Sequence, residues 1–381
     1  MLKNPSNFES ELKKNQAGGS NFFTEVVPYP VYYLKSSVFM PQMLSELPHG
    51  ILDVQASQLH QFVDDLTLVN LNGKIKRPIF ISILQHGNET TGWDALRVFL
   101  KQHLPNLPRS LILLFGNIQA AKDNVRQLEG GVDFNRCWPG IRPNHHLVAK
   151  KMAEITQFVQ QQKPLASVDI HNNTGRNPHY AGINAIKKEH INLASMFSQT
   201  IIHITSPDGI QSGAFAEFCP AITIECGMSG TADGIEQTLT FLKNLCQLTD
   251  LNQIPGVSEN QQVMNIFAVV KVKKAITIGI QGQTEELVDF EIPDDLDYHN
   301  FHQLDAGTQF GHLQSVQMPI TVTDQLDHDI TDQYFYINEQ KLCLKQSVMP
   351  AMITLSIQAI RLDCLCYLMR PLTQQTKTPT H

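Results

Sequence analysis

Four short apolar runs, separated by segments with helical spacing, limit the fold of this chain more than any other feature. The runs are "IFISIL" (79–84), "LILLF" (111–115), "ASVDI" (166–170) and "AITI" (221–224). They lack a strict alternation of apolar and polar residues, which is typical of strands buried on both faces of a sheet. Between them, residues 91–104 and 146–162 repeat apolar residues every three or four positions. This order predicts an α/β fold with a mostly parallel, mixed sheet flanked by helices.

A polar segment with a Pro-Gly pair, residues 249–262, ends this order, and we interpret it as a domain boundary. Four later pieces resemble short strands separated by Gly and Pro: "VMNIFAVVKV", "AITIGIQ", "TQFGHLQSV" and "AMITLSIQAIRL". We therefore expect a catalytic α/β domain over residues 1–255, a smaller β-rich C-terminal domain over 263–370 and a disordered polar tail over 371–381.

Polar residues of the kinds that perform catalysis follow three of the four apolar runs directly. "QHGNE" follows the first, "HNNTG" the third and "ECG" the fourth, which places His86, Glu89, His171 and Glu225 at strand ends. Because ligands of open α/β sheets bind beyond the carboxyl ends of the strands, we expect these side chains to meet at one edge. Two imidazoles and a carboxylate can hold a catalytic zinc ion and leave a position open. Glu225 could then remove a proton from the attacking water.

The competing interpretation of these residues is structural. His-x-x-Glu is a weak motif by itself, and Glu89 could simply stand at the positive end of the helix that follows it. Glu225 taken alone fits a loop ion pair. The occurrence of all four residues at strand ends favours the metal site.

A loop bounded by Gly and Pro, "GGVDFNRCWPG" (130–140), sets Asn135 beside Arg136. The planar fork of an arginine binds a carboxylate through two hydrogen bonds, and a neighbouring amide can share that carboxylate. Arg126 could polarise a carbonyl group and stabilise the oxyanion that forms on it. Arg176, five residues after His171, is a candidate second contact for an anionic group of the substrate. A solvated salt bridge is the alternative for each arginine.

Composition restricts the class of partner. The chain has 381 residues, with 29 Lys and Arg against 36 Asp and Glu, a net charge of −7 and no basic block. These values argue against nucleic acid and anionic membranes as partners. Because we find neither a signal peptide in the first twenty residues nor a run of 18 apolar residues, we expect a cytoplasmic protein. Seven cysteines without a C-x-x-C pair indicate reduced thiols, with "CLCYL" (364–368) in the core.

Four motifs in this order, "HGNE", "VDFNRCWPG", "DIHNNTG" and "ITIECG", resemble the signature of the zinc carboxypeptidase-like superfamily, and specifically its succinylglutamate desuccinylase/aspartoacylase branch. The resemblance implies that His86, Glu89 and His171 bind one zinc ion and that Glu225 activates water. It further implies that Asn135 and Arg136 hold a substrate carboxylate, and that Arg126 polarises the carbonyl group. The β-rich tail resembles the second domain of that branch.

Together these features predict a zinc-dependent hydrolase that cleaves the amide bond of a small, carboxylate-bearing N-acyl amino acid. Two alternatives stay open: a metallocarboxypeptidase acting on short peptides, and a protein without turnover that binds a ligand through zinc. The expected partner is a small molecule, with neither nucleic acid nor membrane. The sequence is compatible with a homo-oligomer but does not determine the oligomeric state, the acyl group or the amino acid.

Overall fold

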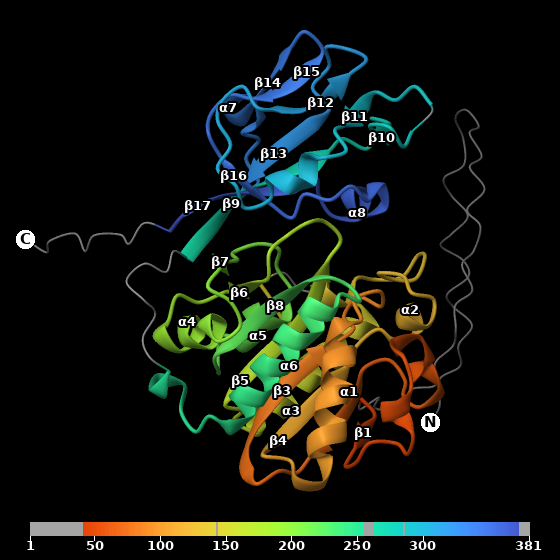
Figure 1. The fold of residues 1–381 in the computed structure, drawn as a ribbon, viewed down its shortest axis with the longest axis vertical. Helices are drawn as coiled ribbons and strands as arrows, with labels where there is room; N and C mark the ends of the chain where they lie inside the picture. The colour runs from red at the N-terminus through yellow and green to blue at the C-terminus, as the bar shows by residue number, and fades with distance from the viewer. Residues whose placement is uncertain (1–40, 142–143, 255–262, 285, 373–381) are drawn as a thin grey trace, which may run out of the picture. The chain divides into compact units, whose positions relative to one another are not determined.

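The computed structural model describes residues 41–141, 144–254, 263–284 and 286–372, which belong to one unit. A large mixed sheet dominates this unit (Figure 1). Its strands follow the spatial order β1 (Met43–Leu44), β2 (Thr67–Leu71), β4 (Arg109–Phe115), β3 (Ile75–Ile83), β5 (Ala166–Asn173), β8 (Ala221–Met228), β6 (Tyr180–Ile183), β7 (Ile201–His203), β9 (Val263–Val272), β17 (Cys366–Pro371) and β16 (Met349–Ala351), with β13 (Ile320–Asp324) paired to β9.

The centre of the sheet is parallel: β3 pairs in parallel with β4 and β5, and β5 pairs in parallel with β8. β2 and β6 run antiparallel to their neighbours β4 and β8. The four apolar runs of the sequence are β3, β4, β5 and β8, as predicted. Their carboxyl ends therefore lie at one edge of the sheet.

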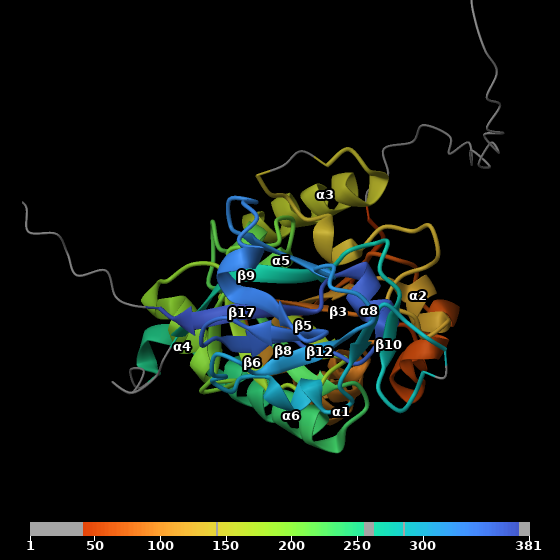
Figure 2. The same ribbon diagram turned by 90° about the horizontal axis from the view of Figure 1, so that it is seen from above.

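Helices cover both faces of this sheet (Figures 1 and 2). α1 (Thr91–His103) and α6 (Ala232–Gln247) lie on one face, and α3 (Leu147–Gln161) and α5 (Gln211–Phe215) lie on the other. The remaining helices are α2 (Ile118–Lys122), α4 (Lys188–Ser195), α7 (Thr331–Tyr334) and α8 (Ile357–Leu362). In the part of the chain that the structure describes, no helix has the length and apolarity to cross a membrane.

Strand β3 shows why the apolar runs lack alternation. Ile79 and Ile81 belong to the core beneath α1 and α6, while Phe80, between them, belongs to the core beneath α3. The ring of Phe80 stacks on Phe215 of α5, with centroids 4.9 Å apart. Because successive side chains of a strand point to opposite faces and both faces are buried, apolar residues follow one another without alternation.

The C-terminal part has a second sheet with its own core. Its five strands follow the order β10 (Ile278–Ile280), β11 (Phe290–Ile292), β12 (Gln309–Leu313), β15 (Lys341–Leu344) and β14 (Phe335–Asn338). Phe290, Phe310 and Phe335 are fully buried in this core. The β-rich character predicted for the region is therefore present.

The two parts share the large sheet. β9 pairs with β7 of the α/β part and also with β17, so the sheet continues across the segment that we interpreted as a boundary. The structure differs from the predicted strand content at residues 357–362, which form helix α8 instead. Ser356 accepts the Ala359 N–H and begins this helix.

The end of the chain continues this sheet up to Leu372. Pro371 is the last residue of β17, and the Leu372 N–H donates to Val263 O. The rest of the predicted tail, residues 373–381, lies outside the described residues. The cysteines at 364 and 366 are buried in the core, as expected.

Candidate metal centre and active site

The loop after β3 positions His86 and Glu89. Leu84 adopts a left-handed conformation (φ 58°) and turns the chain out of the strand. Gly87 then passes so close to α2 that a Cβ atom would lie 2.2 Å from the backbone carbon of Ala120, so only glycine fits here. The Glu89 N–H donates to His86 O (3.1 Å), and α1 begins two residues later. This tight turn brings the imidazole and the carboxylate together.

Neighbouring parallel strands supply the other two residues predicted at strand ends. His171 on β5 and Glu225 on β8 are direct partners in the strand register. Asp169 lies two residues before His171, and alternate residues of a strand point to the same face. The edge of the sheet thus collects all four residues that the sequence placed there.

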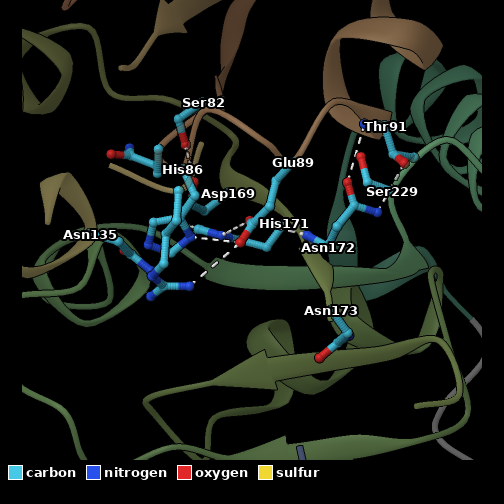
Figure 3. Close-up of polar contacts among 12 residues, drawn as sticks. Ser82, His86, Glu89, Thr91, Asn135, Asp169, His171, Asn172, Asn173 and Ser229 are labelled. Atoms are coloured by element: carbon cyan, nitrogen blue, oxygen red, sulfur yellow. Dashed lines mark hydrogen bonds and ion pairs between the residues drawn. The ribbon is translucent and has the colours of Figure 1, made fainter. Parts of the chain in front are cut away.

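His86, Glu89 and His171 form a compact, buried group. Glu89 bridges the two imidazoles: its Oε1 lies 2.7 Å from His86 Nδ1, and its Oε2 lies 2.7 Å from His171 Nδ1 (Figure 3). Potential ligand atoms of the three side chains all lie within 4.8 Å of one another. Two imidazole nitrogens and one carboxylate are a donor set that zinc accepts.

Two further carboxylates orient the imidazoles. His86 Nε2 lies 3.0 Å from Asp133 Oδ1, and His171 Nε2 lies 2.8 Å from Asp169 Oδ2. Because a carboxylate can only accept, each imidazole donates to its aspartate from Nε2, and Nδ1, which also faces a carboxylate, carries a proton that a metal ion would replace. Carboxylates behind metal-binding histidines commonly set the ring orientation in this way. The residues present therefore fit a metal ion.

The charges of this group are strongly coupled. Although burial opposes ionisation, the imidazoles of His86 and His171 hold the pKa of Glu89 well below its usual value. Burial likewise disfavours a charged His171, but Asp169 and Glu89 raise its pKa well above the usual value. Because the anionic carboxylates favour positive charge between them, the pocket suits a cation.

Glu225 lies beside this group in a different environment. Its Oε2 is buried and has no hydrogen-bond partner in the described structure. Burial, together with the charge of Glu89, raises the pKa of Glu225 to about 8, although His171 and Arg126 act in the opposite direction. A carboxyl group with such a pKa can exchange a proton near neutral pH, as a general base requires.

Arg126 reaches the pocket and is held by acidic groups. Its Nη2 donates to Asp133 Oδ2 at 3.1 Å, and its Nη1 lies 3.7 Å from Glu89 Oε1. Asp133 also accepts the Asn135 N–H at 2.9 Å. Asp133 therefore connects His86, Arg126 and the predicted carboxylate-binding loop.

Asn135 and Arg136 line the same pocket as His86, Glu89 and His171. Asn135 Oδ1 is buried without a hydrogen-bond partner in the described structure. Arg136 Nη1 donates to the backbone O of Asn135 (2.9 Å), and its Nη2 lies 3.5 Å from Asp363 Oδ2. The structure therefore places this predicted pair where a ligand could reach it.

Residues of the C-terminal part complete the pocket, and sequence reasoning did not find them. The lining includes Met352, Thr354, Asp363, Cys364 and Tyr367. Asp133 and Asp169 were also missed as site residues. Asp169 could have been found from the sequence, because it is an isolated carboxylate inside the apolar run "ASVDI", and a buried charge requires a partner.

The structure does not bring Arg176 into this pocket. Its side chain is half exposed; its Nε lies 3.6 Å from Asp297 Oδ1, and the guanidinium stacks over the Tyr298 ring at 4.3 Å. It lines a separate surface pocket with His179 and Tyr298. The expectation that Arg176 contacts the substrate does not agree with this placement, because local partners hold the side chain elsewhere.

Comparison with known proteins agrees with the resemblance read from the motifs. Residues 78–249 match the family model described as "Succinylglutamate desuccinylase/Aspartoacylase catalytic domain". No curated protein matched the chain.

Solved structures share the fold over most of the chain. The succinylglutamate desuccinylase from Chromobacterium violaceum has a TM-score of 0.53 and 16% identity, over 81% of this chain and 89% of that one. The succinylglutamate desuccinylase from Vibrio parahaemolyticus has a TM-score of 0.53 and 14% identity, over 80% and 84%. A product-bound ectoine utilization protein from Ruegeria pomeroyi has a TM-score of 0.50 and 14% identity, over 80% and 88%. At such identities these matches establish the fold.

Proposed function

Since residues 78–249 of this chain match the model of the succinylglutamate desuccinylase/aspartoacylase catalytic domain, we propose that the protein is a zinc-dependent hydrolase of small N-acyl amino acids. One observation carries the proposal: two imidazole Nδ1 atoms face one carboxylate, and a buried, unpaired carboxyl group stands on the neighbouring strand. The bond to be cleaved is the amide between the acyl group and the amino acid.

Zinc would be held by Nδ1 of His86, Nδ1 of His171 and the carboxylate of Glu89. When bound, it supplies Lewis acidity at the open position and lowers the pKa of water there. Asp133 and Asp169 hold the two rings in the tautomer that this arrangement needs.

Glu225 is the proposed general base, and it later returns its proton to the leaving amine. The side chain suits this role because it lies in the pocket with a free Oε2 atom and a raised pKa. A base with a pKa near the working pH accepts and releases a proton at similar cost.

Arg126 and the pair Asn135 and Arg136 are the proposed substrate contacts. Arg126 is fixed near the metal-binding group by Asp133 and Glu89, so its guanidinium can stabilise the negative charge that develops on the carbonyl oxygen. Asn135 and Arg136 would bind a carboxylate of the substrate.

A panel assay tests this proposal. The zinc-loaded protein is incubated with N-acyl amino acids and, separately, with dipeptides that have a free carboxyl end, and the released amine is measured. Release from N-acyl amino acids alone supports the proposal, whereas faster release from dipeptides favours a carboxypeptidase. Binding of ligands without any release by wild type would instead indicate a zinc-dependent binding protein. The cytoplasmic location expected from the sequence stays a prediction.

A further inference from the structure

The substrate pocket contains an acidic residue, Asp363, that a plain carboxylate site does not need. Asp363 follows α8 in the C-terminal part, and its side chain is 35% exposed. It lines the metal pocket and also the adjoining cleft, where Lys271 of β9 lies with its side chain exposed to solvent. A substrate in the pocket can therefore reach the carboxylate of Asp363.

Asp363 partly neutralises the arginine proposed to bind the substrate. Its Oδ2 lies 3.5 Å from Arg136 Nη2, and its Oδ1 accepts a hydrogen bond from the Tyr367 hydroxyl at 3.4 Å. Only one nitrogen of Arg136 contacts Asp363, and the distance is long. The pair therefore lacks the two parallel hydrogen bonds that a guanidinium can form with a carboxylate. The side chain of Arg136 is itself 29% exposed. Both charges of this pair thus stay accessible to a ligand.

The remaining fixed charges of the pocket are balanced as well. Arg126 pairs with Asp133 at 3.1 Å, so each of these two residues is the counter-ion of the other. The carboxylates of Glu89 and Asp169, which contact the imidazoles, together match the charge of one divalent metal ion. Glu225 adds no positive charge in either protonation state, so with neutral imidazoles the pocket has no net positive charge left for a substrate that carries only negative groups.

From this balance we infer that Asp363 binds an ammonium group, and that the substrate is a mono-N-acylated diamino acid, with one carboxylate and one free ammonium. The carboxylate binds Arg136 and the ammonium binds Asp363, so each charge of the pair gains a partner. A substrate with extra carboxylates would meet Asp363 as a like charge. This inference rests on the proposed function and names its substrate class.

Two pairs of compounds that differ only in the ammonium group test it. The pairs are Nε-acetyl-lysine with 6-acetamidohexanoate, and Nα-acetyl-lysine with Nα-acetylnorleucine. In at least one pair the zinc-loaded wild type should prefer the ammonium compound by about tenfold or more in kcat/KM. Asp363→Asn should lower kcat/KM for that compound roughly 10- to 150-fold, the worth of a hydrogen bond between charged groups. The partner without the ammonium should be unaffected or improved.

Suitable variants separate charge recognition from a structural role. Asp363→Glu keeps the negative charge and should keep the preference, while Asp305→Asn removes an exposed acid of the C-terminal part outside the pocket and should change nothing. An equal preference in wild type and Asp363→Asn would overturn the inference. Equal improvement of both compounds in Asp363→Asn would also overturn it, since Asp363 would then only compete with the substrate for Arg136.

A binding measurement distinguishes failure of this inference from failure of the proposed hydrolase. Calorimetry of the same compounds on zinc-loaded Glu225→Gln, with and without Asp363→Asn, requires no turnover. If wild type hydrolyses none of the compounds but Asp363 still determines tighter binding of the ammonium member, the proposed hydrolase is wrong and the ammonium site stands. If wild type hydrolyses both members equally and both bind equally, the hydrolase stands and the ammonium site is wrong.

Discussion

Replacing Asp169 by Asn should weaken zinc binding without removing any ligand of the metal. Asp169 is fully buried, accepts from the Ser82 hydroxyl and orients His171 through Nε2. The amide of Asn is nearly isosteric and can still accept from His171 Nε2, while the Ser82 hydroxyl can rotate and accept instead of donate. The substitution therefore removes the negative charge and little else.

The size of the effect follows from that lost charge. A hydrogen bond to a charged group contributes about 1.5–3 kcal/mol, and one between neutral groups about 0.5–1.5 kcal/mol. The difference, about 1–1.5 kcal/mol, corresponds to roughly a tenfold weaker zinc affinity. This value lies at the lower end of the roughly 10- to 100-fold range typical for groups that orient metal ligands.

Competition with a chromophoric chelator measures the zinc dissociation constant of wild type and Asp169→Asn. Asp65→Asn is the matched control, because Asp65 accepts the Gln119 N–H (2.9 Å) and does not line the metal pocket. Metal-free melting temperatures show whether each variant is folded. A folded Asp169→Asn protein with the zinc affinity of wild type would refute the reasoning that Asp169 tunes His171 as a ligand.

Four further predictions follow from the pocket. His171→Ala should lose the bound divalent metal, and elemental analysis that finds wild-type occupancy would disprove the site. Glu225→Gln should keep the metal but lose roughly 10²- to 10⁴-fold in kcat, since an amide cannot accept the proton; an unchanged kcat excludes Glu225 from the mechanism. Arg136→Ala should lower kcat/KM roughly 10- to 150-fold, with partial rescue by Lys. The gap between a substrate and its carboxamide analogue should shrink in that variant, and a gap of wild-type size would assign the carboxylate contact to another residue. Arg176→Ala should leave the preference between dicarboxylic and neutral substrates unchanged, because Asp297 and Tyr298 hold this side chain outside the pocket; a changed preference would restore Arg176 to the substrate site.

The sequence by itself determined the central sheet and the residues of the candidate metal centre. Apolar runs without alternation mark strands buried on both faces, and this pattern depends only on neighbouring residues. Because parallel strands end at a common edge, His86, His171 and Glu225 could be brought together without knowing the rest of the fold. The loop with Asn135 and Arg136 was found in the same way, from residue types that stand next to each other.

Only the tertiary structure decided which charges meet. Asp133 contacts His86 across 47 positions of the chain, and Asp363 contacts Arg136 across 227. Arg176 has the same charge as Arg136, yet Asp297 and Tyr298 turn it to another surface. An ion pair depends on the distance between two side chains, and the energy of a pair falls as that distance grows. Hydrophobic periodicity does not encode such distances between remote segments, so the charge balance of the pocket, and with it the inferred preference for an ammonium group, comes from the folded chain alone.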